Sequence, residues 1–173
     1  LNKNLRKQEL INDLDEIGIY DYSLFEDQVF LRPYNGKVLR AVDYEMSRGC
    51  PFTCSYCVET VIQSYYEFFD KTDRGSLLQA KKYLRNKSAK RIFEELKILH
   101  DKFKIELFRV QDTNFLTVNR KVLIELSELL NESDLDIKLY IETRPEGINE
   151  KSLELLKKLK VDGVGMGIEL ATQ

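Results

Sequence analysis

Apolar residues recur at helical spacing in three stretches of the chain. Two of them follow Ser88 and Asn119, whose short polar side chains can accept a hydrogen bond from a free amide of the first helical turn, and the third starts near Asn149 or Glu150. The apolar positions behind them advance by three and four residues, which predicts three amphipathic helices. They are Ile92, Phe93, Leu96, Leu99 and Phe103; then Val122, Leu123, Leu126, Leu129 and Leu130; then Leu153, Leu156 and Leu159.

Four shorter apolar runs separate these helices and are typical of β-strands. They cover residues 41–46, 105–110, 137–141 and 164–168. Strands that alternate with helices pair in parallel through right-handed crossovers, so we expect an α/β fold with a parallel sheet. Side chains with a function should then follow the carboxyl ends of the strands. Four strands are too few to close an eight-stranded barrel.

The first 40 residues have a different pattern. Residues 1–17 place Leu5, Leu10, Ile11, Leu14 and Ile17 near helical spacing, which fits a short amphipathic helix, a docking linker or a solvated tail. Asn35-Gly36 lies between two apolar runs and can close a small hairpin. We therefore expect an N-terminal linker or docking segment over 1–40 and the βα units over 41–173.

The stretch 59–85 is longer than a plain connection between a strand and a helix. It contains the aromatic residues Tyr65, Tyr66, Phe68 and Phe69, and its turn signal is at 73–76. Its role cannot be read from the pattern.

Composition narrows the classes of protein that fit. The chain has 173 residues, 43% of them hydrophobic, which suffices for one domain with a core. Its 27 basic and 29 acidic residues are interspersed and give a formal charge of -2, so nothing favours a nucleic-acid partner. No apolar run is long enough to span a bilayer, and the start has no signal-peptide pattern, so we expect a cytoplasmic protein without a membrane partner.

All three cysteines, Cys50, Cys54 and Cys57, fall within eight residues. Pairing them as disulfides would leave one thiol over, and structural zinc usually takes four protein ligands. The single histidine, His100, could be a fourth zinc ligand, but it lies in a helical apolar pattern. Three thiolates can instead hold a 4Fe-4S cluster and leave one iron open to a small molecule.

The cysteine spacing, with Tyr56 before the last cysteine, resembles the signature of the radical S-adenosylmethionine (SAM) enzymes. The flanking residues Ser47-Arg48-Gly49 and Pro51-Phe52 resemble the version in members that carry an upstream cobalamin-binding domain. This resemblance covers residues 43–170 and is weakest over 59–85. It implies a partial (βα) barrel, of which about four units are present.

The resemblance also implies cofactors and partners. A 4Fe-4S cluster on the three cysteines would bind SAM and cleave it reductively to a 5'-deoxyadenosyl radical. Cobalamin would bind, if it is used, through a domain absent from this chain. An electron donor such as flavodoxin or ferredoxin, and a small-molecule or peptide substrate, would complete the reaction.

Four further residues match positions where the family contacts SAM. Tyr56 would lie beside the adenine, Asp112 would accept from the methionyl amine, and Arg144 would pair with the methionyl carboxylate. Glu169, in Gly167-Ile168-Glu169, would face the ribose or the amino-acid end of SAM. Turn or helix-capping contacts for Asp112, and an ion pair with Glu142 or Glu169 for Arg144, are open alternatives. No catalytic side chain can be named.

We therefore expect a radical SAM enzyme, with methylation of an unknown substrate as one outcome. Because the first residue is Leu1 and the last strand stops near the chain end, we expect part of a longer protein that turns over poorly alone. Two alternatives stay open: a non-catalytic iron-sulfur electron-transfer or sensor protein, and a zinc-stabilised binding module.

Overall fold

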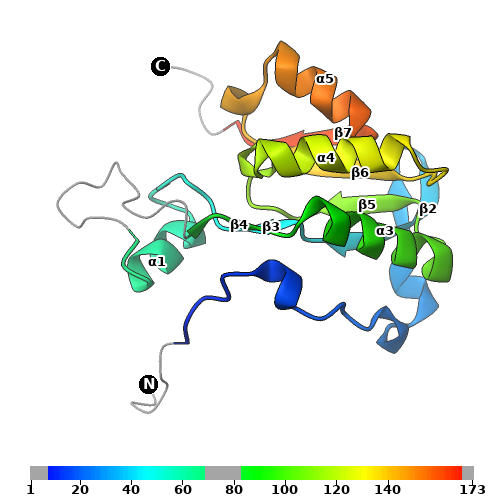
Figure 1. Cartoon of the computed structure of the whole chain (residues 1–173), viewed down its shortest axis with the longest axis horizontal. Coiled ribbons are helices and arrows are strands. Elements are labelled where there is room, and N and C mark those ends of the chain that lie inside the picture. The colour runs from blue at the N-terminus through cyan, green and yellow to red at the C-terminus, as the bar shows by residue number, and fades with distance from the viewer. Residues whose placement is uncertain (1–7, 69–82, 169–173) are drawn as a thin grey trace.

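A five-stranded sheet forms the centre of the computed structural model, which describes residues 8–68 and 83–168 (Figure 1). The strands follow the order β1-β2-β5-β6-β7. The last four are parallel to one another, and only β1 is antiparallel to its neighbour. Their bounds are Leu31–Tyr34 for β1, Lys37–Tyr44 for β2, Leu107–Val110 for β5, Lys138–Thr143 for β6 and Val161–Met166 for β7.

Three helices cover one face of this sheet (Figure 1). They are α3 (Ala89–Phe103), α4 (Arg120–Asn131) and α5 (Glu150–Lys158). Ser88 and Asn119 cap their helices as predicted, accepting from the Arg91 and Lys121 amides. The third helix begins at Glu150, one of the two predicted starts, and Asn149 forms a capping box with Ser152. The predicted alternation of strands and helices, and with it the α/β fold of a partial (βα) barrel, is confirmed.

The core lies between the helices and the sheet. Ile92 and Leu96 of α3, Leu126 of α4, Phe108 of β5 and Leu139 of β6 are fully buried in it. Because side chains alternate across a strand, the neighbours of these core residues point to the other face of the sheet. There Asp43 accepts from Gln111 Nε2 at 3.1 Å and lies 3.8 Å from Arg109 Nη1. Asp43, Arg109 and Gln111 thus form a polar group on the face of the sheet opposite the helices.

The predicted hairpin joins β1 to β2. Asn35 and Gly36 take positive φ angles of 47° and 74°, as a two-residue turn between antiparallel strands requires. The boundary expected between residues 40 and 41 is wrong in this respect, because β2 already begins at Lys37. Hairpin pairing extends the sheet toward the N-terminus, so residues 31–40 belong to it and not to a linker.

Residues 8–30 contain three short 3₁₀ turns and no α-helix. Of the three alternatives for residues 1–17, the described part therefore fits a docking segment and not an amphipathic helix. The segment is held by tertiary contacts: Leu14 is fully buried, Arg91 Nη2 donates to the Ile17 carbonyl at 2.7 Å, and Asp15 accepts from the Ser88 amide at 2.8 Å. This docking on α3 replaces the helical turns that the spacing suggested.

A buried charged network lies behind that segment. Glu95 of α3 pairs with Lys87 at 2.6 Å and with Arg91 at 2.6 Å, and accepts from the Tyr44 hydroxyl at 2.6 Å. Lys87 and Glu95 are 6% and 4% exposed. Burial, with Glu95 beside it, raises the pKa of Tyr44 well above its usual value. Removing one partner would leave a buried charge unpaired, so the network holds β2 and α3 in register.

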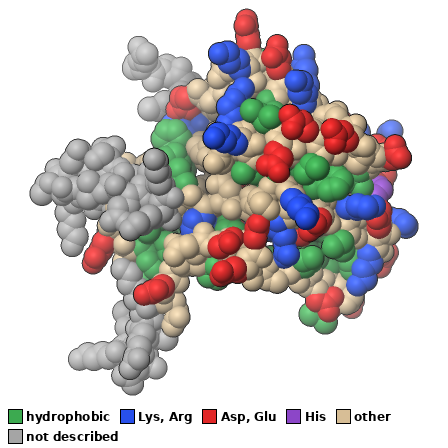
Figure 2. All heavy atoms as spheres, in the orientation of Figure 1, with side chains coloured by type: hydrophobic (Ala, Val, Ile, Leu, Met, Phe, Trp, Pro, Cys, Tyr) green, Lys and Arg blue, Asp and Glu red, His purple; other side chains and the backbone are tan. Residues whose placement is uncertain are grey.

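The helical face of the molecule is charged. Figure 2 shows Lys and Arg side chains mixed with Asp and Glu over α3, α4 and α5. Within residues 8–68 and 83–168, no helix has both the length and the apolar character needed to cross a membrane. The turn signal at 73–76 lies outside the described residues.

Candidate functional site

The cysteine loop follows the carboxyl end of β2, as the sequence predicts. After Tyr44 the chain forms the two-residue strand β3 (Ser47–Arg48), which pairs with β4 (Arg85–Asn86). The loop then runs to Cys57, the cap residue of helix α1 (Val58–Tyr65). All three cysteines are free thiols; Cys50 is buried, and the other two are partly exposed.

The backbone of the loop is held at several points. Gly49 has a φ of 97°, and a Cβ there would lie 2.5 Å from the Tyr83 carbonyl oxygen. The Cys54 carbonyl accepts from the Cys57 amide at 3.0 Å and from the Thr60 hydroxyl at 2.7 Å. The three thiols are therefore presented by a folded loop.

The three cysteines are the candidate metal ligands of this loop. In the described part of the chain, no three His, Cys, Asp or Glu side chains gather closely enough to hold one metal ion. Burial raises the pKa of the Cys50 thiol above its usual value. Metal binding would have to displace that proton.

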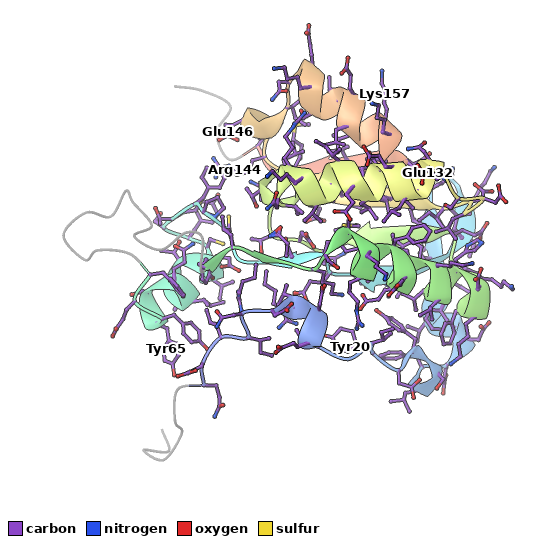
Figure 3. The ribbon with its side chains drawn as sticks, in the orientation of Figure 1. Tyr20, Tyr65, Glu132, Arg144, Glu146 and Lys157 are labelled. Atoms are coloured by element: carbon purple, nitrogen blue, oxygen red, sulfur yellow. The ribbon has the colours of Figure 1, made fainter. Side chains whose placement is uncertain are left out.

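Arg144 brings a cation to the cysteine loop from β6. It directly follows the last residue of that strand, and its Nη1 donates to Cys54 Sγ at 3.2 Å. The guanidinium carbon lies 4.4 Å from the centre of the Phe52 ring, and Glu146 completes the arrangement with an ion pair. That ion pair raises the pKa of Arg144 further above its usual value. Figure 3 shows Arg144 and Glu146 side by side at this end of the sheet.

Asp112, which follows β5, is hydrogen-bonded to the residues that lead from β2 into the cysteine loop. Its side chain is 2% exposed, and its carboxylate accepts from the Met46 amide at 2.8 Å and from the Ser47 hydroxyl at 2.6 Å. Burial raises the pKa of Asp112 to about 6, against the opposing effect of these hydrogen bonds. These bonds join Asp112 to a distant segment and form neither a local turn nor a helix cap, and contact with the methionyl amine stays a prediction.

The other two predicted contacts are placed differently. Tyr56 is 67% exposed, next to Cys57 at the start of α1. That exposure is compatible with a ligand beside its ring, and the adenine contact stays a prediction. Glu169 lies outside the described residues.

His100 is not near the cysteines. It lies in the last turn of α3, and its Nδ1 is 2.8 Å from the Ile105 carbonyl oxygen. The chain enters β5 directly after this turn, so His100 lies at the amino ends of the parallel strands, whereas the cysteines follow a carboxyl end. A zinc site made of the three cysteines and His100 is therefore wrong.

Two residues of this site were missed from the sequence. Gln63 of α1 is fully buried, and its Nε2 donates to the Cys50 and Phe52 carbonyls. Glu59 bonds the Tyr83 hydroxyl and lies 3.4 Å from the Thr113 hydroxyl. The only signal in the sequence was position: Glu59 and Gln63 lie two and six residues after Cys57, in a stretch without a helix breaker.

The sequence profile of the radical SAM superfamily matches residues 44–173, about three quarters of the chain. The chain belongs to the radical SAM superfamily. The matched region begins at the end of β2 and includes the cysteine loop, Asp112 and Arg144.

Relatives of this radical SAM chain are longer proteins. An uncharacterized methyltransferase of Pyrococcus horikoshii is 31% identical over 170 residues, which are 98% of this chain and 32% of that protein. The anaerobic magnesium-protoporphyrin IX monomethyl ester cyclase of Rubrivivax gelatinosus is 31% identical over 94% of this chain and 26% of that protein. The chain thus spans a third or less of the length of these relatives.

Among solved structures, the cobalamin-dependent S-adenosylmethionine radical enzyme OxsB aligns with 75% of this chain and 18% of its own. The TM-score of that alignment is 0.47, with 20% sequence identity.

Proposed function

We propose that this chain is the cluster-binding part of a radical SAM enzyme. Cys50, Cys54 and Cys57 would hold a 4Fe-4S cluster, and SAM would bind the iron that has no protein ligand. The observation that carries the proposal is the meeting of three free thiols and the Arg144 guanidinium at the carboxyl ends of β2 and β6. The superfamily match supports it.

When bound, the cluster would supply the electron that cleaves a carbon-sulfur bond of SAM. The chain's own residues would bind SAM and orient it. Arg144 is suited to a carboxylate ligand beside Cys54, because its planar guanidinium presents parallel N–H donors that the ring of Phe52 helps to hold in place. Tyr56 offers an exposed ring next to Cys57 for stacking on the adenine.

We propose methylation of an unreactive carbon as the overall reaction of the longer protein. The name of the Pyrococcus horikoshii relative supports this, as does that of the hopanoid C-3 methylase of Methylococcus capsulatus, 27% identical over 72% of this chain and 20% of that protein. The loop flanks Ser47-Arg48-Gly49 and Pro51-Phe52 resemble those of cobalamin-linked members and support cobalamin as the methyl carrier. A small-molecule or peptide substrate and a flavodoxin or ferredoxin donor belong to the same proposal.

Free thiols in one loop are what a reducing compartment maintains, and this supports a cytoplasmic location. A non-catalytic electron-transfer or sensor protein would need a fourth cluster ligand. His100, the only histidine, lies at the other end of the sheet and cannot supply it, so a carboxylate would have to be that ligand.

The test is anaerobic reconstitution of the chain with iron and sulfide. We expect about four irons per chain and the absorption of a 4Fe-4S cluster. Cys54→Ser should lose most of the iron, and Ser55→Ala, a change in the same loop that removes no thiol, should retain it. Stoichiometric zinc without iron uptake, or equal iron in Cys54→Ser and the parent chain, would contradict the proposal.

A further inference from the structure

Gln63 connects α1 to the first half of the cysteine loop. Its Nε2 donates to the Cys50 carbonyl at 2.7 Å and to the Phe52 carbonyl at 2.9 Å. An amide nitrogen carries two N–H groups, so these two bonds use both of them. Gln63 lies 13 residues after Cys50 and 11 after Phe52 in the sequence, so the two bonds tie a distant part of the loop to the helix.

The environment of Gln63 makes these bonds strong. The side chain is 0% exposed, and water does not compete for its N–H groups. The Gln63 oxygen has no hydrogen-bond partner among the described residues. A buried amide whose oxygen is unpaired costs free energy that a hydrophobic residue of the same size would not. The residue is therefore better suited to shaping the loop than to stabilising the helix.

The Cys50 and Phe52 carbonyls thus share one anchor, the amide nitrogen of Gln63. The second half of the loop has separate anchors, since the Cys54 carbonyl is held by Thr60 and by the Cys57 amide. Phe52 in turn lies under the guanidinium of Arg144. Loss of the Gln63 bonds should therefore release Cys50 and Phe52 first.

We infer that Gln63 is a positioning residue of the cluster site, which holds Cys50 and Phe52 ready for metal before any metal binds. This rests on the proposed role of the cysteines as cluster ligands. Gln63 itself contacts no thiol in the structure; it acts through the backbone of Cys50 and, by way of Phe52, on the place of Arg144. Its effect should therefore appear in the metal-free chain as well as in the loaded one.

The variant Gln63→Met tests this, because methionine has nearly the same length and no N–H donor. Gln28→Met is the matched control, since Gln28 is exposed in a 3₁₀ turn far along the chain from the cysteines. The metal-free chain, kept reduced and without oxygen, is treated with iodoacetamide, and the labelling rate of each cysteine is followed by mass spectrometry of its peptide.

We expect Gln63→Met to raise the labelling rate of Cys50 roughly tenfold, because the Cys50 and Phe52 carbonyls lose the two hydrogen bonds that tie them to α1. Cys54 and Cys57 should change much less, and Gln28→Met should change none of the three. An unchanged Cys50 rate would overturn the inference. So would an equal rise at all three cysteines, because that pattern reports general unfolding.

Iron uptake gives a second readout. Gln63→Met should take up iron and sulfide several-fold more slowly than the parent chain and Gln28→Met. If the parent chain itself takes up no cluster, the proposed function fails, while the labelling of Cys50 still decides whether Gln63 positions the loop. Selective labelling with normal iron uptake would contradict a role in preparing the site for metal.

Discussion

At the scale of single residues, the site depends on a few side chains that reach the cysteine loop from other elements. Arg144 is one of them: it comes from the end of β6, contacts Cys54 Sγ and covers Phe52. These contacts use both the charge and the planar shape of the Arg144 guanidinium, so a lysine at this position should not perform the same role.

Arg144→Lys should weaken SAM binding roughly tenfold or more, because lysine cannot make the paired N–H contacts of a guanidinium to a carboxylate. The iron content of the reconstituted chain should stay unchanged, since Arg144 is not a metal ligand. Titration of the reduced cluster with SAM measures the affinity. Arg120→Lys, at an exposed position on α4, is the control, and equal affinities in the two variants would count against the assignment.

Asp112 leads to a prediction about pH. Its pKa in the folded chain is about 6, raised by burial from a usual value of 3.8. The folded chain thus binds the proton more tightly than the unfolded chain does, so this group favours the folded state most below pH 4 and loses that contribution as the pH rises through 6. The change is about 3 kcal/mol, to order of magnitude.

Asp112→Asn removes the titration and keeps a side chain of the same shape. Relative to the parent chain, the free energy of unfolding of Asp112→Asn should therefore rise between pH 4 and 6.5, as measured by urea unfolding of the metal-free chain. Asp136→Asn is the control: it makes the same substitution at an exposed position and measures its effect on the free energy of unfolding there. A difference that does not vary with pH would show that Asp112 does not titrate in this range.

At the scale of elements, the helices, the hairpin turn and the place of the cysteine loop could be predicted because local signals in the sequence determine them. Ser88, Asn119 and Asn149 cap their helices because a short polar side chain satisfies a free amide within three residues, and this is legible in sequence. The turn at Asn35-Gly36 is equally local, because it needs only two residues that accept positive φ. The carboxyl end of β2 as the place of the cysteines followed from the alternation of strands and helices.

What could not be predicted depends on contacts between distant residues. Strands β3 and β4 have two residues each and no alternation to reveal them. The segment around Leu14 has helical spacing, yet docking on α3 decides its conformation. The predicted SAM contact of Asp112 rests on its match to a family position after the second strand, whereas its hydrogen bonds to Met46 and Ser47 join it to residues at least 65 positions away.

The contact between Gly49 and Tyr83 leads to a prediction for the β3–β4 region. Gly49→Ala would place a methyl group 2.5 Å from the Tyr83 carbonyl oxygen, in a backbone conformation unfavourable for alanine. We expect a loss of about 1–3 kcal/mol in the free energy of unfolding, measured with urea. Gly18→Ala, where nothing lies within 4 Å of the new methyl group, should change it by less than about 0.5 kcal/mol. Equal stabilities for the two variants would be inconsistent with this packing.

At the scale of the whole molecule, the chain presents the cysteine loop at one end of a four-stranded parallel arrangement covered by helices on one face. It spans a third or less of its longer relatives, and their names include both a methyltransferase and a cyclase. What the superfamily members share is the cluster and SAM, so the central claim concerns this step and not the later reaction.

The most direct test is electron paramagnetic resonance of the reconstituted, reduced chain with and without SAM. If SAM binds the iron that Cys50, Cys54 and Cys57 leave open, its addition should change the spectrum of the reduced cluster, and Arg144→Lys should need more SAM for the same change. A reduced 4Fe-4S cluster whose spectrum is identical with and without saturating SAM would contradict the account.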